Sequence, residues 1–339
     1  MLGSAAANDA GKRNAALRIG VFCPLDYHPE LGRPHHERYA QVLDQAEQTE
    51  RAGLESFWVA EHHFSDYGIG PDPAVLLAAV AARTQRIRLG TAAAVLPLHT
   101  PLRLAESLAL VDQLSHGRLE CGVASGYLHY EFEGFGQSLA QRRERFDEAL
   151  AIVRRAWRGG PVNFAGEHFQ VAAPPLNVQP LQAGGPPLHI AVTRPAVVPH
   201  VGRKGLGLLT IPYVALRDLT ALREAVAAYR GTLPADARGA VTAALHVFCA
   251  EGPDDPALDL ARAALERYLR TRVVPGARYA GTPPAEDFVL FGDAAALAPR
   301  LRALDALGLD RLLALADFGG LSPRLVAGSL MRLGGLAAG

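Results

Sequence analysis

The chain alternates short apolar runs with longer segments in which apolar residues recur every three or four positions. The short runs have the length and composition of buried strands, and they lie at residues 17–22, 56–59, 87–94, 118–123, 188–192, 206–211, 243–248 and 311–315. The segments between them have the spacing of amphipathic helices, as at Tyr39, Val42 and Ala46. Because parallel strands need long crossovers, this alternation predicts a parallel sheet.

Four expected helices begin with a capping residue followed by proline, at Asp72-Pro73, Thr100-Pro101, Asp255-Pro256 and Ser322-Pro323. The oxygen of such a cap accepts a hydrogen bond from an unpaired helix amide, and proline is tolerated at the first helical position. Eight strands with helices between them favour a closed (βα)8 TIM barrel over an open doubly wound sheet. No GxGxxG motif follows the first strand, which weighs against a dinucleotide-binding fold.

Two stretches interrupt the alternation. Residues 163–181 are rich in Pro, Val and Phe and predict a short hairpin and a loop. Residues 273–288 have no period and predict a mobile loop near the barrel mouth. We expect residues 1–16, which lack the apolar core of a signal peptide, to form a disordered leader. Residues 17–339 then form a single barrel with insertions at its C-terminal mouth.

The composition excludes several classes of partner. The length of 339 residues suits one α/β barrel with insertions, and the 34 basic residues balance the 34 acidic ones. A neutral chain has no basic field with which to hold nucleic acid or an anionic membrane, and no run of 18 apolar residues predicts a spanning helix. Basic pairs such as Arg142-Arg143 alternate with acidic residues, which favours a solvated helix face.

Three cysteines, Cys23, Cys121 and Cys249, lie in or beside apolar runs and form no CxxC pair. This arrangement indicates buried free thiols in a protein of the reducing cytoplasm.

The strand at residues 56–59 leads into Glu61-His62-His63, which is the leading candidate for chemistry. TIM-barrel enzymes carry their active sites at the C-terminal ends of the strands, and histidine transfers protons near neutral pH. Adjacent side chains on an extended backbone point in opposite directions, so only one histidine easily faces a pocket. Each histidine has a structural role under a loop as its alternative, and Glu61 either orients a histidine or bonds a backbone amide.

A metal site of the hydrolase type is disfavoured, because three consecutive residues do not easily converge on one ion. Small residues follow at 90–94, after the third strand begins. They let a flat ring approach the backbone, but small residues alone favour tight packing of the strand against a helix.

Several blocks together resemble the bacterial luciferase-like flavin-dependent monooxygenases. They include Trp58-Val59-Ala60-Glu61-His62-His63-Phe64 and the segments 86–97, 105–106, 112–119, 122–127 and 131–136, with weaker similarity at 188–210 and 291–315. The resemblance implies a (βα)8 barrel that binds FMN at its C-terminal mouth and acts as a homodimer. It further implies that a separate NAD(P)H:flavin reductase supplies reduced FMN, and that O2 then oxygenates a small organic substrate.

The resemblance also assigns roles to residues. It makes His62 the proton donor or acceptor beside the flavin, and it joins Ala92 and Ala93 by a cis peptide bond beneath the flavin ring. Ala124 stands where luciferases carry a reactive cysteine, so light emission is not implied. Tyr127 is expected either to line the mouth or to pack under the following loop.

The phosphate end departs from the family pattern, because Ser125 stands where many relatives have an arginine that pairs with the FMN phosphate. Pro195 can begin a helix with free amides, and Arg194 precedes it. We therefore hypothesise that Arg194, with Thr193 and Ser125, holds the phosphate, the alternative being a surface arginine.

The sequence thus predicts an FMN-dependent two-component monooxygenase. The alternatives are an F420-dependent oxidoreductase of the same fold, a non-catalytic flavin-binding subunit, which the presence of His62 disfavours, and a metal hydrolase.

Overall fold

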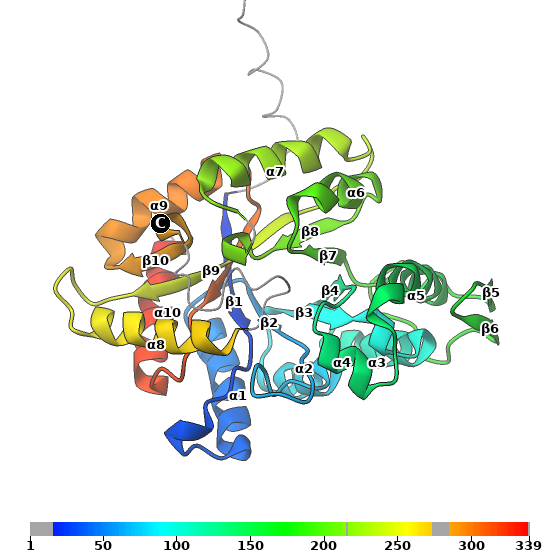
Figure 1. Ribbon diagram of the computed structural model, residues 1–339, viewed down its shortest axis with the longest axis horizontal. Coiled ribbons are helices and arrows are strands. Elements are labelled where there is room, and N and C mark those ends of the chain that lie inside the picture. Colours follow the sequence, from blue (N-terminus) through cyan, green and yellow to red (C-terminus); the bar gives the residue numbers. More distant parts are fainter. Residues whose placement is uncertain (1–15, 215, 273–284, 338–339) are drawn as a thin grey trace, which may run out of the picture.

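The computed structural model describes residues 16–214, 216–272 and 285–337. Eight parallel strands close into a ring in the order β9-β11-β1-β2-β3-β4-β7-β8, with β8 pairing back onto β9 (Figure 1). The ring strands are Arg18–Cys23 (β1), Ser56–Val59 (β2), Arg88–Val95 (β3), Leu119–Ala124 (β4), Leu188–Val192 (β7), Gly207–Thr210 (β8), Val241–Cys249 (β9) and Arg311–Leu315 (β11). The predicted TIM barrel is confirmed.

All eight predicted strands form, and their ends differ from the predicted ones by at most two residues. The strands are recognisable because the barrel buries both of their faces, so that every residue of β9 is buried. The structure adds β10 (Val289–Gly292), which pairs with the end of β9 beyond the part that pairs with β8. The predicted hairpin is also present, as β5 (Val162–Ala165) and β6 (Gln170–Ala173), at the edge of the molecule beyond α5 (Figure 1).

Helices surround the ring of strands (Figure 1). They are His35–Arg51 (α1), Pro73–Arg83 (α2), Pro101–Leu114 (α3), His129–Gly134 (α4), Arg142–Ala156 (α5), Val198–Arg203 (α6), Leu219–Thr232 (α7), Ala257–Thr271 (α8), Ala294–Ala306 (α9) and Pro323–Ala337 (α10).

The predicted helix starts hold with one exception. Asp72, Asp255 and Ser322 each accept a hydrogen bond from an amide of the following helix, at 2.9, 2.9 and 3.4 Å for the shortest bonds. Thr100 makes no such side-chain bond, although Pro101 begins α3 as predicted. The expectation of a side-chain cap at Thr100 was therefore wrong, and the fixed backbone of proline marks that helix start.

A buried charge cluster closes the barrel at the end opposite the mouth. The Arg311 guanidinium makes two hydrogen bonds to Glu120, of 2.8 and 2.9 Å, and two to Glu55, both of 2.8 Å. His189 bonds the Glu120 carboxylate at 2.7 Å. Burial alone would raise the pKa of Glu120, but His189 and Arg311 hold it well below its usual range. The cluster ties β11, β4 and β7 together and leaves the mouth free for chemistry.

Two predictions, the leader at 1–16 and the mobile loop at 273–288, fall largely outside the described residues. The three cysteines are buried free thiols, as predicted. Within the ranges that the structure describes, no helix combines the length and the apolar character that crossing a membrane requires.

Candidate active site

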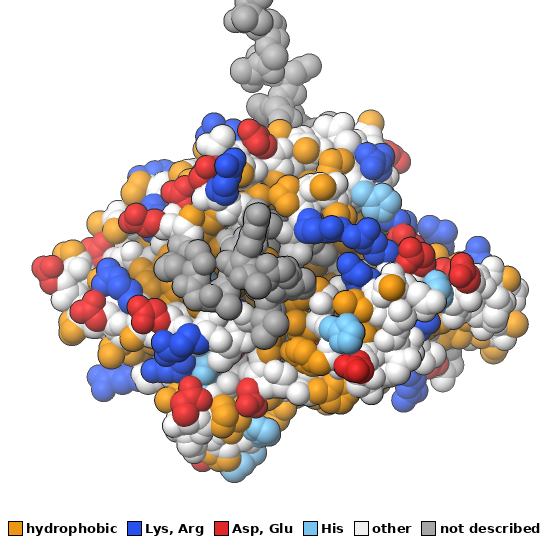
Figure 2. Space-filling view, in the orientation of Figure 1, with side chains coloured by type: hydrophobic (Ala, Val, Ile, Leu, Met, Phe, Trp, Pro, Cys, Tyr) orange, Lys and Arg blue, Asp and Glu red, His pale blue; other side chains and the backbone are white. Residues whose placement is uncertain are grey.

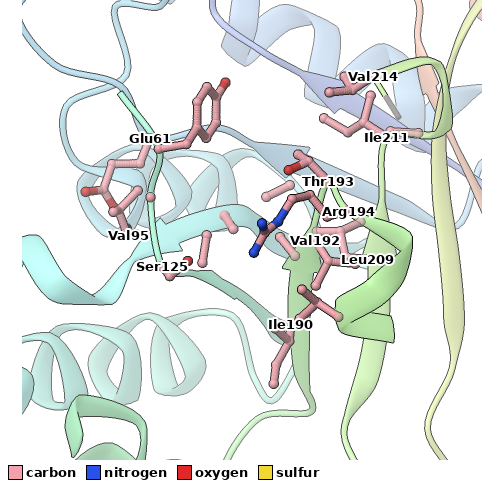
Figure 3. Close-up of a pocket in the computed structure, with 18 of the residues that line it drawn as sticks. Glu61, Val95, Ser125, Ile190, Val192, Thr193, Arg194, Leu209, Ile211 and Val214 are labelled. Carbon is pink, nitrogen blue, oxygen red and sulfur yellow. Dashed lines mark hydrogen bonds between the residues drawn. The ribbon is translucent and has the colours of Figure 1, made fainter. Parts of the chain in front are cut away.

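A cavity of about 840 Å³ lies at the C-terminal mouth of the barrel. This volume is in the upper part of the roughly 300–1,000 Å³ range of ligand pockets, which leaves room for two ring systems. Every residue predicted for the site lines this cavity, and they are His62, Ala92, Ala93, Ser125, Thr193 and Arg194. Figure 3 labels the last three. The barrel brings them together because the C-terminal ends of its parallel strands all meet at the mouth.

His62 is held by a carboxylate that the sequence did not single out. Its Nδ1 lies 3.2 Å from Glu131 Oε1, and the same oxygen accepts the backbone N–H of His63 at 3.0 Å. A carboxylate can only accept, so the shared hydrogen lies on Nδ1 and leaves Nε2 of the neutral ring as an acceptor. No described residue hydrogen-bonds this Nε2. Burial lowers the pKa of His62, Glu131 raises it, and the net shift is downward.

His63 and Glu61 have structural roles. His63 Nε2 bonds Glu61 Oε1 at 3.0 Å, His99 Nε2 lies 2.9 Å from the same oxygen, and Glu61 Oε2 accepts the Val95 amide at 3.0 Å. Burial alone would raise the pKa of Glu61, but these hydrogen bonds hold it at about 2. Both roles considered for Glu61 are therefore present, since it orients a histidine and also ties the end of β2 to the end of β3.

The floor of the cavity includes the small residues of β3. The peptide bond between Ala92 and Ala93 is cis, as the resemblance implies. The pairing of β3 with β4 is regular up to Thr91 and resumes at Ala94, so the two alanines interrupt the ladder. Both are partly exposed and line the cavity, and their small side chains leave backbone that a flat ring can approach.

Arginines gather at the β7 side of the cavity. Arg194 extends into the cavity toward the side where Ser125 lies (Figure 3). Arg142 and Arg143, from the start of α5, line the same cavity. Burial is the largest cause that lowers the pKa of Arg142, and the positive charges of Arg143 and Arg194 lower it further. All three arginines line this one cavity. Figure 2 shows basic side chains gathered between α5 and β7 on this face.

The interpretation of Arg142-Arg143 as a solvated helix face holds for Arg143, which is exposed, but is incomplete, because Arg142 is half-buried and both side chains line the cavity. The sequence did contain a signal that these arginines serve a binding site. Basic residues in the first turn of a helix oppose the helix dipole, which favours acidic groups there. An anion bound between the arginines and the helix start would offset this cost.

The segment after Arg194 differs from the expected helix start. Pro195–Val197 forms a 3-10 helix, and α6 that follows is only six residues long. Positive charge at this corner therefore comes mainly from the arginines rather than from a long helix.

Three further predictions concern Cys121, Tyr127 and a metal site. Cys121 is fully buried in the barrel wall, as expected. Tyr127 lines the cavity and bonds Tyr67 through their hydroxyls at 2.6 Å. Within the described parts of the chain, no group of three or more His, Cys, Asp or Glu side chains is arranged to hold a metal ion.

The sequence matches those of known flavin-dependent oxygenases. Residues 17–311 match a family described as luciferase-like monooxygenase. A protein called y4vJ from Sinorhizobium fredii is 34% identical over 230 residues, which cover 66% of this chain and 65% of that protein. The oxygenase component of the flavin-dependent trigonelline monooxygenase of Acinetobacter baylyi is 31% identical over 181 residues, covering 53% of this chain and 50% of the relative. The alignments thus span about half to two thirds of these relatives.

Solved structures share the fold along nearly the whole chain. The monooxygenase RslO1 from Streptomyces bottropensis superposes with a TM-score of 0.84 at 25% identity, covering 94% of this chain and 98% of that one. An F420-dependent secondary alcohol dehydrogenase superposes with a TM-score of 0.73 at 18% identity, covering 94% and 98%. The second likeness concerns the fold alone.

Proposed function

Since the chain belongs to the luciferase-like monooxygenase family, we propose that it is the oxygenase component of a two-component flavin-dependent monooxygenase. It takes reduced FMN from a separate NAD(P)H:flavin reductase and uses O2 to oxygenate a small organic substrate. The observation that carries the proposal is one cavity lined by an oriented histidine, a strip of small strand residues and a cluster of arginines.

These residues fit FMN. The dianionic phosphate matches Arg142, Arg143 and Arg194, since guanidinium groups bind phosphate oxygens with charge-assisted hydrogen bonds. The flavin ring system matches the exposed backbone at Ala92 and Ala93. Arg194 with Thr193 and Ser125 was the predicted phosphate site, and the proposal now adds the two arginines of α5.

When bound, reduced FMN supplies the electrons with which O2 is activated. The protein controls proton transfer. Burial lowers the pKa of His62 by more than Glu131 raises it, so the ring is neutral at pH 7 and its Nδ1–H is bound to Glu131. Its Nε2 can therefore accept a proton at the reacting edge and later return it.

The cavity wall excludes water. Ile190, Val192, Leu209, Ile211 and Val214 line the β7 and β8 side of the cavity (Figure 3). An apolar wall keeps water from a site in which stray protons would divert the reaction to peroxide.

Two alternative functions, a non-catalytic subunit and an F420-dependent enzyme, are disfavoured. A non-catalytic subunit has no need of an oriented base, whereas His62 is fixed by a buried carboxylate. An F420-dependent enzyme shares the fold, but the trigonelline monooxygenase component, at 31% identity, and 4-hydroxyprotoasukamycin monooxygenase, at 34%, favour a monooxygenase. We place the protein in the cytoplasm, in keeping with its three buried free thiols.

We further propose a homodimer. Val75 of α2 and Leu110 and Leu114 of α3 are large apolar residues that are at least half exposed, and a second copy would cover them. Measuring the mass in solution tests this, and a monomer at micromolar concentration contradicts it.

The function is tested by supplying FMN, NADH and a flavin reductase under ¹⁸O2, with a panel of cyclic organic acids. We expect one ¹⁸O atom in the product of the wild type. The His62→Ala variant should keep its fold and consume O2, but release peroxide instead of product. The His129→Ala variant, which alters an exposed histidine of α4 outside the cavity, is the matched control.

Failure of FMN to bind, or product formation in the His62→Ala variant that matches O2 consumption as in the wild type, contradicts the proposal. Binding of F420 in preference to FMN supports the alternative enzyme class instead.

A further inference from the structure

A buried arginine at the end of α8 has no role in the function derived so far. Arg272 is 5% exposed and lines the cavity. Its Nη2 donates a 2.6 Å hydrogen bond to the carbonyl oxygen of Tyr67, and its Nε is buried with no hydrogen-bond partner in the described structure. No described carboxylate forms an ion pair with it. Asp26 raises the pKa of Arg272 through space but forms no ion pair with it. A buried guanidinium without a carboxylate in direct contact is costly, so this arginine points to a ligand.

Tyrosines surround this guanidinium. Its central carbon lies 3.8 Å from the ring centroid of Tyr67 and 4.0 Å from that of Tyr268, so the cation is held between two aromatic faces. The hydroxyls of Tyr213 and Tyr268 are 3.5 Å apart, and both residues line the cavity. Burial raises the pKa of Tyr268 to about 12, so its phenol stays protonated and can donate a hydrogen bond.

This cluster lies away from the elements assigned to the flavin. α8 follows β9, and β9 stands opposite β3 in the ring of eight strands. The alanines of β3 and the arginines beside β7 therefore line one part of the mouth, and Arg272 approaches from another. The cluster still reaches the catalytic histidine, because the Tyr67 ring that stacks on Arg272 also packs edge-on against His62, with centroids 4.6 Å apart.

We propose that Arg272 binds an anionic oxygen of the substrate, and that the substrate is a planar aromatic carboxylate whose ring lies among Tyr67, Tyr213 and Tyr268. The carboxylate accepts hydrogen bonds from the free N–H groups of the guanidinium and supplies the missing countercharge. The tyrosine rings then hold the substrate ring beside His62. This inference rests on the proposed function, which it deepens by naming the substrate class.

The inference is tested with two probes of equal size, 2-naphthoate and 2-naphthamide, of which only the first is an anion at pH 7. Binding of each is measured by calorimetry to the full chain, with and without FMN. We expect the wild type to bind the carboxylate more tightly than the amide by roughly 10- to 100-fold, as a charge-assisted hydrogen bond implies. Arg272→Gln should abolish this preference, and Arg272→Lys, which keeps the charge, should retain part of it.

Arg270→Gln provides the matched control, because Arg270 is exposed on the same helix and lies outside the cavity. It should keep the full preference. Equal binding of the two probes by the wild type overturns the inference, and that measurement does not depend on how any variant folds. A loss of FMN affinity in Arg272→Gln with the probe preference intact also overturns it, because the cation would then serve the flavin. Failure of the wild type to bind FMN counts against the proposed function, and the probe ratio is still measured without FMN.

Discussion

The phosphate site yields the sharpest prediction, because the family resemblance implies an arginine at the position where this chain has Ser125. Replacing Arg194 by alanine removes a guanidinium that lines the cavity on the side of Ser125. A hydrogen bond to a charged group contributes about 1.5–3 kcal/mol. Because Arg194 is exposed, solvent screens its charge and the lower value applies. The expected loss is therefore about 1.5 kcal/mol, or roughly tenfold in the dissociation constant of FMN.

The assay compares FMN with riboflavin, which lacks the phosphate. Quenching of flavin fluorescence gives both dissociation constants for the wild type and for the Arg194→Ala variant. FMN affinity should fall about tenfold and riboflavin affinity should stay unchanged, since only the phosphate contacts the arginine. Raising the salt concentration should weaken FMN binding more in the wild type than in the variant, because a screened charge pair is being lost.

The control is Arg203→Ala, which removes an exposed arginine of the neighbouring helix α6 that does not line the cavity. It should leave both affinities unchanged. The reasoning is refuted if Arg194→Ala leaves the affinity for FMN as it was, or if it weakens riboflavin and FMN equally.

Two further predictions concern the catalytic base and the closed end of the barrel. Glu131→Gln removes the charge that raises the pKa of His62, so this pKa, which is already lowered from 6.5, should fall further. The acid limb of the pH–rate profile should then move to lower pH. An unshifted limb counts against the contact between Glu131 and His62. Glu120→Gln removes one of the two carboxylates that bond Arg311 and leaves Glu55 in place, so denaturant unfolding at pH 7 should show a loss of roughly 1.5–3 kcal/mol. Because Glu120 has a lowered pKa in the folded state, wild-type stability from this group should be present above pH 4.5 and be lost as the pH falls below it.

The barrel could be predicted because its strands carry a signal in local sequence. Strands buried on both faces are continuous apolar runs, and the structure shows all eight of them where the runs lie. β10 was missed because its four residues directly follow a stretch without period, and only pairing with β9 makes them a strand.

The site could be predicted only where residues follow strands. His62 and Arg194 follow the ends of β2 and β7, the Ala92–Ala93 pair lies in the second half of β3, and their approach to one another follows from the barrel. Glu131 was not assigned to His62 because it lies 69 residues away on the short helix α4, and nothing in the spacing links the two.

Arg272 escaped notice for a related reason. At the sequence level it is one basic residue at the end of an amphipathic helix, a place where the helix dipole favours positive charge. Tyr268 precedes it by four residues on α8, but its second aromatic neighbour, Tyr67, comes from the loop after β2, and nothing in the sequence places that loop against it.

A crystal structure of the chain with FMN bound tests the central claim most directly. We predict that the flavin ring lies against Ala92 and Ala93, with His62 at its reactive edge and the phosphate within hydrogen-bond distance of Arg194. A flavin ring outside this cavity, or a phosphate that contacts none of Arg142, Arg143 and Arg194, contradicts it.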